Sequence, residues 1–421
     1  MGDILESEIV AIGALGDGVA RGSDADIFVP LTAVGDKVKI RLGKKERFGY
    51  QSDLLEVLEL SERRVKPVCQ HFGVCGGCRM QHIAESDYAD WMVETVRQTL
   101  LHHGHEDVAI DKPIISPPAA RRRISLKALK TKDNVVLGFH KFGSHQIVAL
   151  KECPVTRPEI TRLFAPLKAI LKEILPARMT AEVSLTLTAS GVDVLIDAAL
   201  EISLEVREKL VDFANTHDLA TLNWQDRGFL DPIVHRREAI MTFGRARVPL
   251  PPAAFIQATE EGEKALVDLV LKATENRSLV ADLFSGLGTF TFPLAEHSKV
   301  LAVEGFKPAV DAAQVGINAT LGLKQIIQKH RDLYRRPLTP VELKGFDAVV
   351  FDPPRAGAKE QADMLKDSDV PTIVSVSCSP NSFGRDGRIL KEGGYVLEGV
   401  TPVGQFTWTP HIELVGVYKK P

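Results

Sequence analysis

Cysteine is scarce in this sequence, with five residues among 421. This scarcity argues against a disulfide-stapled secreted scaffold and favours a reducing compartment. Four of the cysteines precede the midpoint of the chain: Cys69, Cys75 and Cys78 form the run C-x5-C-G-G-C, and Cys153 follows alone. Four thiolates complete one tetrahedral metal or cluster site. Cys378 is then left over near the C-terminus as a candidate nucleophile.

Long apolar runs are also absent. No stretch of about 18 apolar residues occurs, so no membrane span is expected. The N-terminal MGDILESEIV has neither a basic n-region nor an apolar h-region, and no signal peptide is predicted. With 44% apolar and 25% charged residues, the composition is that of a globular protein. We therefore expect a cytoplasmic protein and, at this length, about two or three domains.

An excess of positive charge is missing as well. The formal net charge is −3, which by itself gives no indication that the protein binds nucleic acid. Basic residues nevertheless gather locally, within residues 37–47, 63–66 and 121–130, and the last cluster contains the run Arg121-Arg122-Arg123. Such clusters can contact phosphates while acidic residues elsewhere cancel the total charge. The alternative interpretation is that each basic cluster is simply a solvent-exposed face of the protein.

The chain divides by pattern into three parts. Residues 1–62 show short apolar or alternating runs broken by Gly-Asp turns, which fits a small barrel of the OB type, a fold that often binds RNA. Residues 63–250 carry the four clustered cysteines and mixed helix and strand patterns, which predict an α+β domain. Within residues 251–421, helices and buried strands alternate in the rhythm of a parallel doubly wound sheet. The predicted fold class is therefore α/β with a Rossmann-like C-terminal domain.

Acidic residues follow successive strands of this predicted sheet. The first strand ends in D-L-F-S-G-L-G-T-F, whose glycines let a ligand approach the backbone. The third glycine of the dinucleotide fingerprint is missing, which counts against a nicotinamide cofactor. Glu304, after the second strand, suits the hydroxyls of a ribose, and Asp332, after the third, suits an adenine amino group. S-adenosylmethionine fits this series of residues.

Further polar groups follow the fourth and fifth strands. The run F-D-P-P-R around Asp352 is a loop that nucleic-acid methyltransferases use. Cys378 ends the fifth strand among polar neighbours, and Arg385 lies nearby in sequence, so we expect the pKa of this thiol to be lowered. The alternative is a buried free cysteine. In the later run H-I-E, a carboxylate of Glu413 facing the crevice could act as a general base.

Together these motifs resemble the RumA/TrmA family of RNA uracil-5-methyltransferases. The resemblance runs from end to end and includes C-x5-C-G-G-C, the later Cys153, F-I-Q at 255–257, DLFSGLGTF, AVEG, FDPPRAG, SCSP…RD and H-I-E. It implies a class I methyltransferase domain, an N-terminal TRAM domain, and RNA as the partner of a monomeric enzyme. The branch of the family that carries the cysteines favours 23S ribosomal RNA over transfer RNA as the substrate.

The resemblance also implies roles for individual residues. Cys69, Cys75, Cys78 and Cys153 would hold a 4Fe–4S cluster, with structural zinc as the alternative. Cys378 would attack carbon 6 of uracil, and Glu413 would later remove the proton from carbon 5. The family's cofactor contacts map onto Gln257, Phe284, Thr289, Glu304, Asp332 and Asp352. Thr289 stands where the family commonly has Asn. Oxidation is predicted to act at two separate places, the cluster and Cys378.

Three alternatives stay open at this point. A transfer-RNA uracil-5-methyltransferase would use the same chemistry on another substrate. A non-catalytic iron–sulfur protein that binds RNA would keep the cysteines and basic clusters, but the presence of Cys378 and Glu413 argues against it. A cytosine-5-methyltransferase is disfavoured because no cysteine lies in or near the D-P-P loop.

Overall fold

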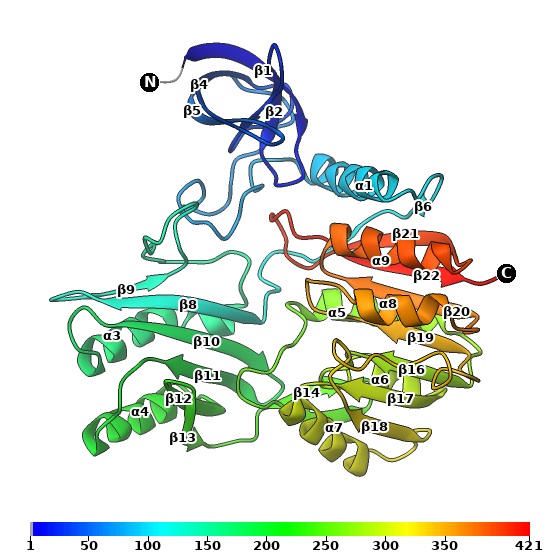
Figure 1. Cartoon of the computed structure of the whole chain (residues 1–421). Helices are drawn as coiled ribbons and strands as arrows, with labels where there is room; N and C mark the ends of the chain where they lie inside the picture. Colours follow the sequence, from blue (N-terminus) through cyan, green and yellow to red (C-terminus); the bar gives the residue numbers. More distant parts are fainter. Residues whose placement is uncertain (1–2) are drawn as a thin grey trace.

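A computed structural model describes residues 3–421, so the first two positions of the predicted barrel lie outside the described residues. Three bodies of β-sheet follow one another along the chain (Figure 1). The first is a closed barrel with the strand order β1-β2-β3-β5-β4, as predicted. Its strands are β1 (Ile4–Ile12), β2 (Gly18–Arg21), β3 (Asp26–Val29), β4 (Lys37–Glu46) and β5 (Gly49–Glu59).

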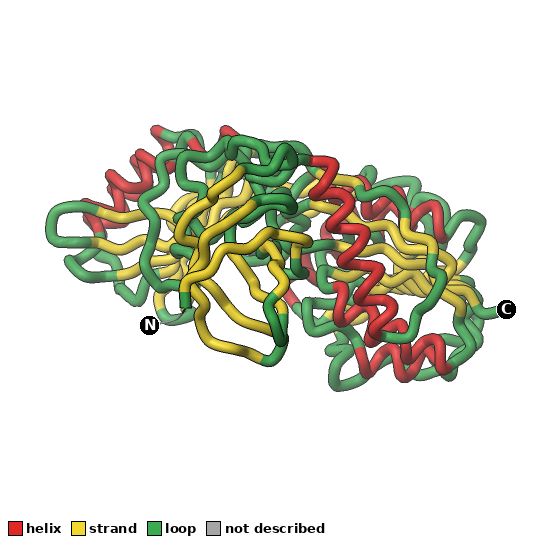
Figure 2. Tube along the Cα trace, turned by 90° about the horizontal axis from the view of Figure 1, so that it is seen from above, coloured by secondary structure: helices red, strands yellow, loops and turns green. Residues whose placement is uncertain are grey.

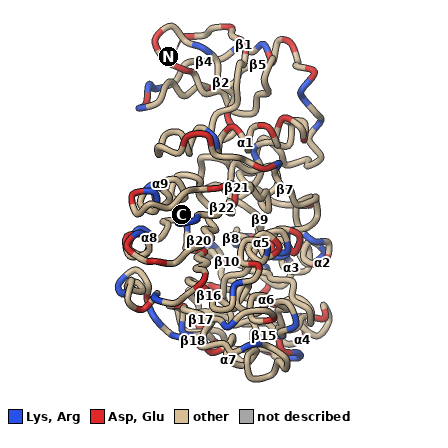
Figure 3. Tube along the Cα trace, turned by 90° about the vertical axis from the view of Figure 1, so that its right-hand side faces the viewer, with Lys and Arg blue, Asp and Glu red and all other residues tan. Residues whose placement is uncertain are grey.

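The basic strand of the barrel is neutralised by its neighbours. On β4, Lys39 lies opposite Glu6 of β1 on one side and Glu56 of β5 on the other. Lys37 forms an ion pair with Glu59, Nζ to Oε2 2.8 Å. Directly opposed residues of antiparallel strands share one face of the sheet, so these charges cancel in place. Acidic and basic segments accordingly interleave along the barrel (Figure 3), so the charges of Lys37 and Lys39 are offset by neighbouring carboxylates.

The second body is a six-stranded sheet in the order β13-β12-β11-β10-β8-β9. Helices α3 and α4 pack against it in one continuous core that joins Leu167 and Leu210 to Val183 and Val194. The expected α+β architecture is present. Its elements are β8 (Arg123–Lys130), β9 (Val135–Gly138), α2 (Pro158–Thr161), α3 (Phe164–Ile174), β10 (Thr180–Thr188), β11 (Gly191–Asp197), α4 (Leu204–Thr216), β12 (Thr221–Asp226) and β13 (Phe229–His235). The hairpin of β14 (Ile240–Phe243) and β15 (Ala246–Pro249) follows.

The third body is a nine-stranded sheet that contains the parallel, doubly wound strands predicted for the C-terminal part. Strands β18-β17-β16-β19-β20 run parallel, and β22 and β21 then join antiparallel. The strands are β16 (Leu279–Leu283), β17 (Lys299–Glu304), β18 (Ile326–His330), β19 (Ala348–Phe351), β20 (Thr372–Ser377), β21 (Val396–Gly404) and β22 (Glu413–Lys419). The helices are α5 (Glu260–Ala273), α6 (Thr291–Ala295), α7 (Lys307–Ala319), α8 (Lys359–Lys366) and α9 (Pro380–Glu392). Figure 2 shows the two open sheets to either side beneath the barrel.

One segment of the predicted middle domain belongs to the third body. Strands β6 (Ala109–Ile110) and β7 (Ile114–Ile115) pair with β21 and extend the nine-stranded sheet. Helix α1 (Glu85–His102) buries Tyr88 and Met92 in the same core as Phe383 of α9. The predicted boundaries 63–250 and 251–421 therefore differ from the structure, because periodicity marks the apolar face of a helix but not the sheet that covers it. No helix among residues 3–421 is long and apolar enough to cross a membrane.

Candidate active site

All eight residues predicted for cofactor binding and catalysis line one cavity of about 510 Å³. They are Gln257, Phe284, Thr289, Glu304, Asp332, Asp352, Cys378 and Glu413. The cavity lies at the carboxyl ends of the parallel strands, because Phe284 follows β16, Asp352 follows β19 and Cys378 follows β20. In an open α/β sheet this edge is where ligands bind.

The turn after β16 is shaped for close approach of a ligand. Phe284 has φ 60°, and Gly286 and Gly288 have φ 54° and 98°, so the backbone passes through the left-handed region. A Cβ on Gly286 would meet no other described atom within 4 Å, whereas one on Gly288 would come 2.5 Å from the Phe292 ring. Gly286 therefore leaves space on the cavity side, and Gly288 allows the turn to pack on α6.

Glu304 ties this turn to the next one. Its Oε2 accepts a hydrogen bond from the Gly286 N–H at 2.9 Å, and its Oε1 accepts one from the Phe306 N–H at 2.6 Å. Beside it, the Phe284 and Tyr334 rings lie with centroids 5.5 Å apart. A nucleoside could bind here, because the Glu304 carboxylate can accept hydrogen bonds from its hydroxyls and the aromatic rings can stack on its base.

Buried carboxyls give the cavity an unusual electrostatic character. Burial and the charge of Asp352 raise the pKa of Glu413 to about 8. Burial raises the pKa of Asp352 and that of Asp282 to about 7. Oδ2 of Asp282 accepts from the Thr291 hydroxyl at 2.5 Å, but its Oδ1 has no partner among the described residues. Asp352 and Glu413 line the cavity, and their desolvated carboxyls favour a cationic ligand; the sulfonium and amino groups of S-adenosylmethionine meet that requirement.

The expected lowering of the Cys378 pKa is wrong. Burial raises the pKa of this thiol to about 11, and the carboxyls of Glu413 and Asp352 add to the effect, while Arg355 opposes it more weakly. Arg385 does not reach the thiol, because its guanidinium donates to Asp386 and to the Ala356 carbonyl. Sequence proximity indicated that Arg385 lies beside the thiol, but on α9 its side chain points toward Asp386 and Ala356 instead.

The other four cysteines line a second cavity of about 570 Å³, and Cys378 and Arg355 line it too. All five thiols therefore border one space, while the prediction that oxidation acts separately on the four cysteines and on Cys378 stays a prediction. Polar hydrogens face several of the sulfurs: the His71 N–H lies 3.4 Å from Cys69 Sγ, and the Gly77 N–H lies 3.4 Å from Cys75 Sγ. Among residues 3–421, no set of three or more potential ligands is arranged to hold a metal ion.

The arginine run at 121–123 is largely internal. Arg122 is 4% exposed, and its Nη2 lies 2.6 Å from the Glu263 carboxylate. Arg123 donates to the Ala254 carbonyl at 2.6 Å, and Arg121 stacks on Phe406 with 5.3 Å between guanidinium and ring centroid. The interpretation of this run as a phosphate-contacting surface is therefore wrong for Arg122, which braces the segment before α5.

Comparison with known proteins agrees with this geometry. Residues 249–420 match the family model described as tRNA (Uracil-5-)-methyltransferase. A protein of Caulobacter vibrioides called an uncharacterized RNA methyltransferase is 40% identical over 420 residues, covering 98% of this chain and 99% of its own. The 23S rRNA (uracil(1939)-C(5))-methyltransferase RlmD of Photorhabdus laumondii is 30% identical, covering 97% and 94%. The chain belongs to the family of RNA uracil-5-methyltransferases.

Membership of this family makes the chain an S-adenosylmethionine-dependent RNA methyltransferase, as the motifs predicted. A crystal structure of Pyrococcus abyssi tRNA (uracil-54, C5)-methyltransferase with S-adenosyl-L-homocysteine shares the fold, with a TM-score of 0.77, 23% identity, and coverage of 98% of this chain and 99% of that one. The barrel, the middle sheet and the methyltransferase sheet all lie within that match.

Sequence reasoning missed several residues of the site. Phe255 and Phe306 line the cofactor cavity and are 69% and 45% exposed, and Tyr334 faces Phe284 across it. Gln405 is buried beside Gln257 and carries no motif of its own. The aromatic residues within F-I-Q and next to A-V-E-G and Asp332 could have indicated the walls of the cavity. Nothing in the sequence pointed to Gln405.

Proposed function

We propose that this enzyme methylates carbon 5 of a specific uridine in RNA through a covalent adduct between Cys378 and carbon 6 of the base. One observation carries the proposal: Cys378, Glu413 and the predicted cofactor contacts all line a single cavity. S-adenosylmethionine supplies a methyl group on a positively charged sulfur. The residues of the chain must then make carbon 5 nucleophilic and remove its proton.

Cys378 begins this sequence. Its thiol loses a proton to solvent, and the thiolate attacks carbon 6 of the uracil, so that the carbon 5–carbon 6 electron pair becomes available at carbon 5. Carbon 5 then takes the methyl group. Glu413 accepts the proton that carbon 5 still carries, and elimination releases the thiolate of Cys378. Gln257, Phe284, Thr289, Glu304, Asp332 and Asp352 hold the cofactor.

The target base enters from the side of the cysteine cavity. Cys378 and Arg355 line both cavities, so a uridine in the cysteine cavity can reach the thiol while the cofactor occupies the other cavity. Arg355, which is exposed and lines both cavities, offers a cation to the phosphate or base of an unstacked nucleotide. A base must leave its stack to enter such a space, so a loop or a flipped nucleotide is the substrate.

Cys69, Cys75, Cys78 and Cys153 hold a 4Fe–4S cluster in this proposal. Their thiols border the same cavity, and the N–H groups near Cys69 and Cys75 are the donors that cluster sulfurs accept from. Structural zinc is the alternative ligand of the same four thiolates. The likeness to RlmD favours 23S ribosomal RNA over transfer RNA, and the N-terminal barrel takes the place of a TRAM domain in gripping it.

Digestion of methylated RNA to nucleosides tests the central claim. The wild-type enzyme should produce 5-methyluridine, whereas Cys378→Ala should bind S-adenosylmethionine and produce none. Normal turnover by Cys378→Ala would sink the mechanism. A gel-stable adduct with 5-fluorouridine RNA should form with the wild type alone, and its absence would favour the non-catalytic RNA-binding alternative. 5-Methylcytidine in the digest would favour the cytosine enzyme.

Two further measurements address the metal and the substrate. Iron and sulfide analysis of anaerobically purified protein should detect a cluster that Cys153→Ser loses and Cys378→Ser keeps, and zinc in place of iron would support the alternative. Mapping of 5-methyluridine in total RNA, with and without the gene, identifies the modified uridine and separates ribosomal from transfer RNA.

A further inference from the structure

A chain of amide side chains links two carboxyls of the cofactor cavity. Gln257 Nε2 donates to Asp352 Oδ2 at 3.2 Å, and Gln405 Nε2 donates to Gln257 Oε1 at 2.7 Å. Gln405 also lies beside Glu413, which pairs with Val403 of β21, and although burial raises the pKa of Glu413, a polar interaction with the Gln405 side chain lowers it. The chain therefore runs from Asp352 through Gln257 and Gln405 to the proposed base.

The direction of these bonds is fixed by a backbone group. The Ala258 N–H donates to Gln405 Oε1 at 2.9 Å. Because a backbone N–H can only donate, the amide oxygen of Gln405 must face it, and the amide nitrogen must face Gln257 and Glu413. The same reasoning turns the nitrogen of Gln257 toward Asp352. Asp352 thus receives an N–H and Glu413 interacts with the Gln405 amide, which favours the ionised, proton-accepting form of each carboxyl.

The surroundings of Gln405 are built closely around it. The residue is 2% exposed and directly follows β21, beside the pairing of Val403 with Glu413. The Ala258 peptide is held from its other side, since the Arg122 N–H donates to the Ala258 carbonyl at 2.9 Å. On α5, a Cβ at Gly262 would lie 2.6 Å from the Gln405 Cβ. Glycine at this position is what leaves room for the amide.

We propose that Gln405 is a positioning residue for methyl transfer, which aims the Glu413 carboxylate at carbon 5 and, through Gln257, orients Asp352. The inference rests on the proposed function, because it takes Glu413 as the base. In the step concerned, Glu413 takes the carbon 5 proton and the C–H electron pair re-forms the carbon 5–carbon 6 double bond. The bond between carbon 6 and Cys378 Sγ breaks, and its electron pair returns to sulfur.

Trapping of the covalent intermediate tests this role. Gln405→Met keeps the length of the side chain and removes the amide. With RNA and methyl-labelled S-adenosylmethionine, it should still transfer the methyl group but release methylated RNA about tenfold or more slowly. Labelled RNA should then accumulate as an adduct on denaturing gels, as Glu413→Gln should also show. A purely structural role would leave the ratio of adduct to free product unchanged.

Gln361→Met is the matched control. Gln361 is also a buried amide, 1% exposed and bonded to Leu338 N–H and C=O, but it does not line the cofactor cavity. It should destabilise the protein without adduct accumulation. Gly262→Ala, which crowds Gln405, is the second test and should accumulate adduct if Gln405→Met does not fold.

Release of product at the wild-type rate by Gln405→Met or, where that variant does not fold, by Gly262→Ala would overturn the proposal. Equal adduct in Gln361→Met would overturn it as well, because any loss of stability would then produce the effect. Failure of the proposed function is a different result: the wild-type enzyme would then form no 5-methyluridine at all.

Discussion

Arg122 and Glu263 form an ion pair inside the protein, with Nη2 and Oε2 2.6 Å apart and side chains 4% and 11% exposed. The pair joins the start of the middle sheet to α5 of the methyltransferase domain. Arg122 also donates from Nε to the Gln257 carbonyl at 3.1 Å. One buried guanidinium therefore connects two domains and supports a residue of the cofactor cavity.

Arg122→Met should lower the free energy of unfolding by about 3–5 kcal/mol, because it leaves Glu263 buried without its partner. Urea denaturation measures the change. Lys264→Met is the control, since its ion pair with Asp268 is exposed on the same helix, and it should cost less than about 1 kcal/mol. Adding Glu263→Leu to Arg122→Met should recover most of the loss. Equal effects of the two single variants would contradict the assignment.

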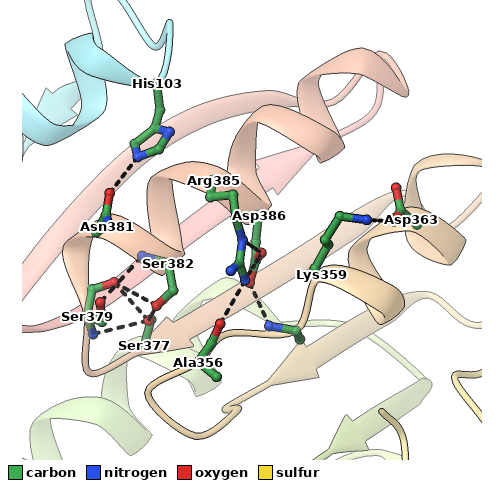
Figure 4. A network of polar contacts seen from close by, with 11 residues as sticks. His103, Ala356, Lys359, Asp363, Ser377, Ser379, Asn381, Ser382, Arg385 and Asp386 are labelled. Atoms are coloured by element: carbon green, nitrogen blue, oxygen red, sulfur yellow. Dashed lines mark hydrogen bonds and ion pairs between the residues drawn. The ribbon is translucent and has the colours of Figure 1, made fainter. Parts of the chain in front are cut away.

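Asp386→Ala should reduce methyl transfer by about tenfold or more, because it frees the loop that carries Arg355 from α9. Asp386 accepts from the Ala358 N–H at 2.7 Å, and the neighbouring Arg385 donates to the Ala356 carbonyl at 2.9 Å (Figure 4). The same figure shows the control: Asp363 pairs with Lys359 on the surface, and Asp363→Ala should leave the rate unchanged. A full rate in Asp386→Ala would show that the loop holds its position without this contact.

Alkylation of Cys378 by iodoacetamide should be slow at pH 7 and should rise about tenfold per pH unit up to pH 10, because the pKa of the thiol is about 11. Mass spectrometry of the free enzyme reports the rate at this site. Glu413→Gln removes one carboxylate that raises the thiol pKa, and should therefore speed the reaction between about pH 8 and 10, where Glu413 is ionised. A rate that levels off between pH 8 and 9, as for an unperturbed thiol, would contradict the geometry of the site.

The stability of the ligand-free enzyme should fall as pH rises from about 5 to 8. The folded-state pKa of Glu413 is about 8, above its ordinary value of 4.5, so the buried carboxyl favours folding only while it holds its proton. Asp352 and Asp282 contribute with the same sign, since their pKa values are about 7. Glu413→Gln should reduce the slope by up to about 1 kcal/mol per pH unit, as denaturant unfolding across this range would show. An unchanged slope would place the titration elsewhere.

The cofactor cavity could be predicted from the sequence because a parallel sheet brings residues that follow different strands to the same edge. Glu304, Asp352 and Cys378 each follow a strand, and the carboxyl ends of parallel strands meet at one edge. What could not be predicted depends on contacts between distant segments. The burial that raises the Cys378 pKa, the ion pair that occupies Arg122 and the amide orientation of Gln405 all require the packed domains, and no local pattern encodes them.

Helix α1 is synthesised long before the surface that buries it. The Tyr88 hydroxyl donates to the Thr409 carbonyl at 2.9 Å across 321 positions of the chain. At about 5–20 residues per second, the ribosome needs roughly 15–60 s to add the residues between them. During that time the apolar face of α1 has no β21 or α9 to cover it. Until the C-terminal strands and α9 have been synthesised, only the barrel can contact α1, through bonds such as that from Trp91 Nε1 to the Gly13 carbonyl.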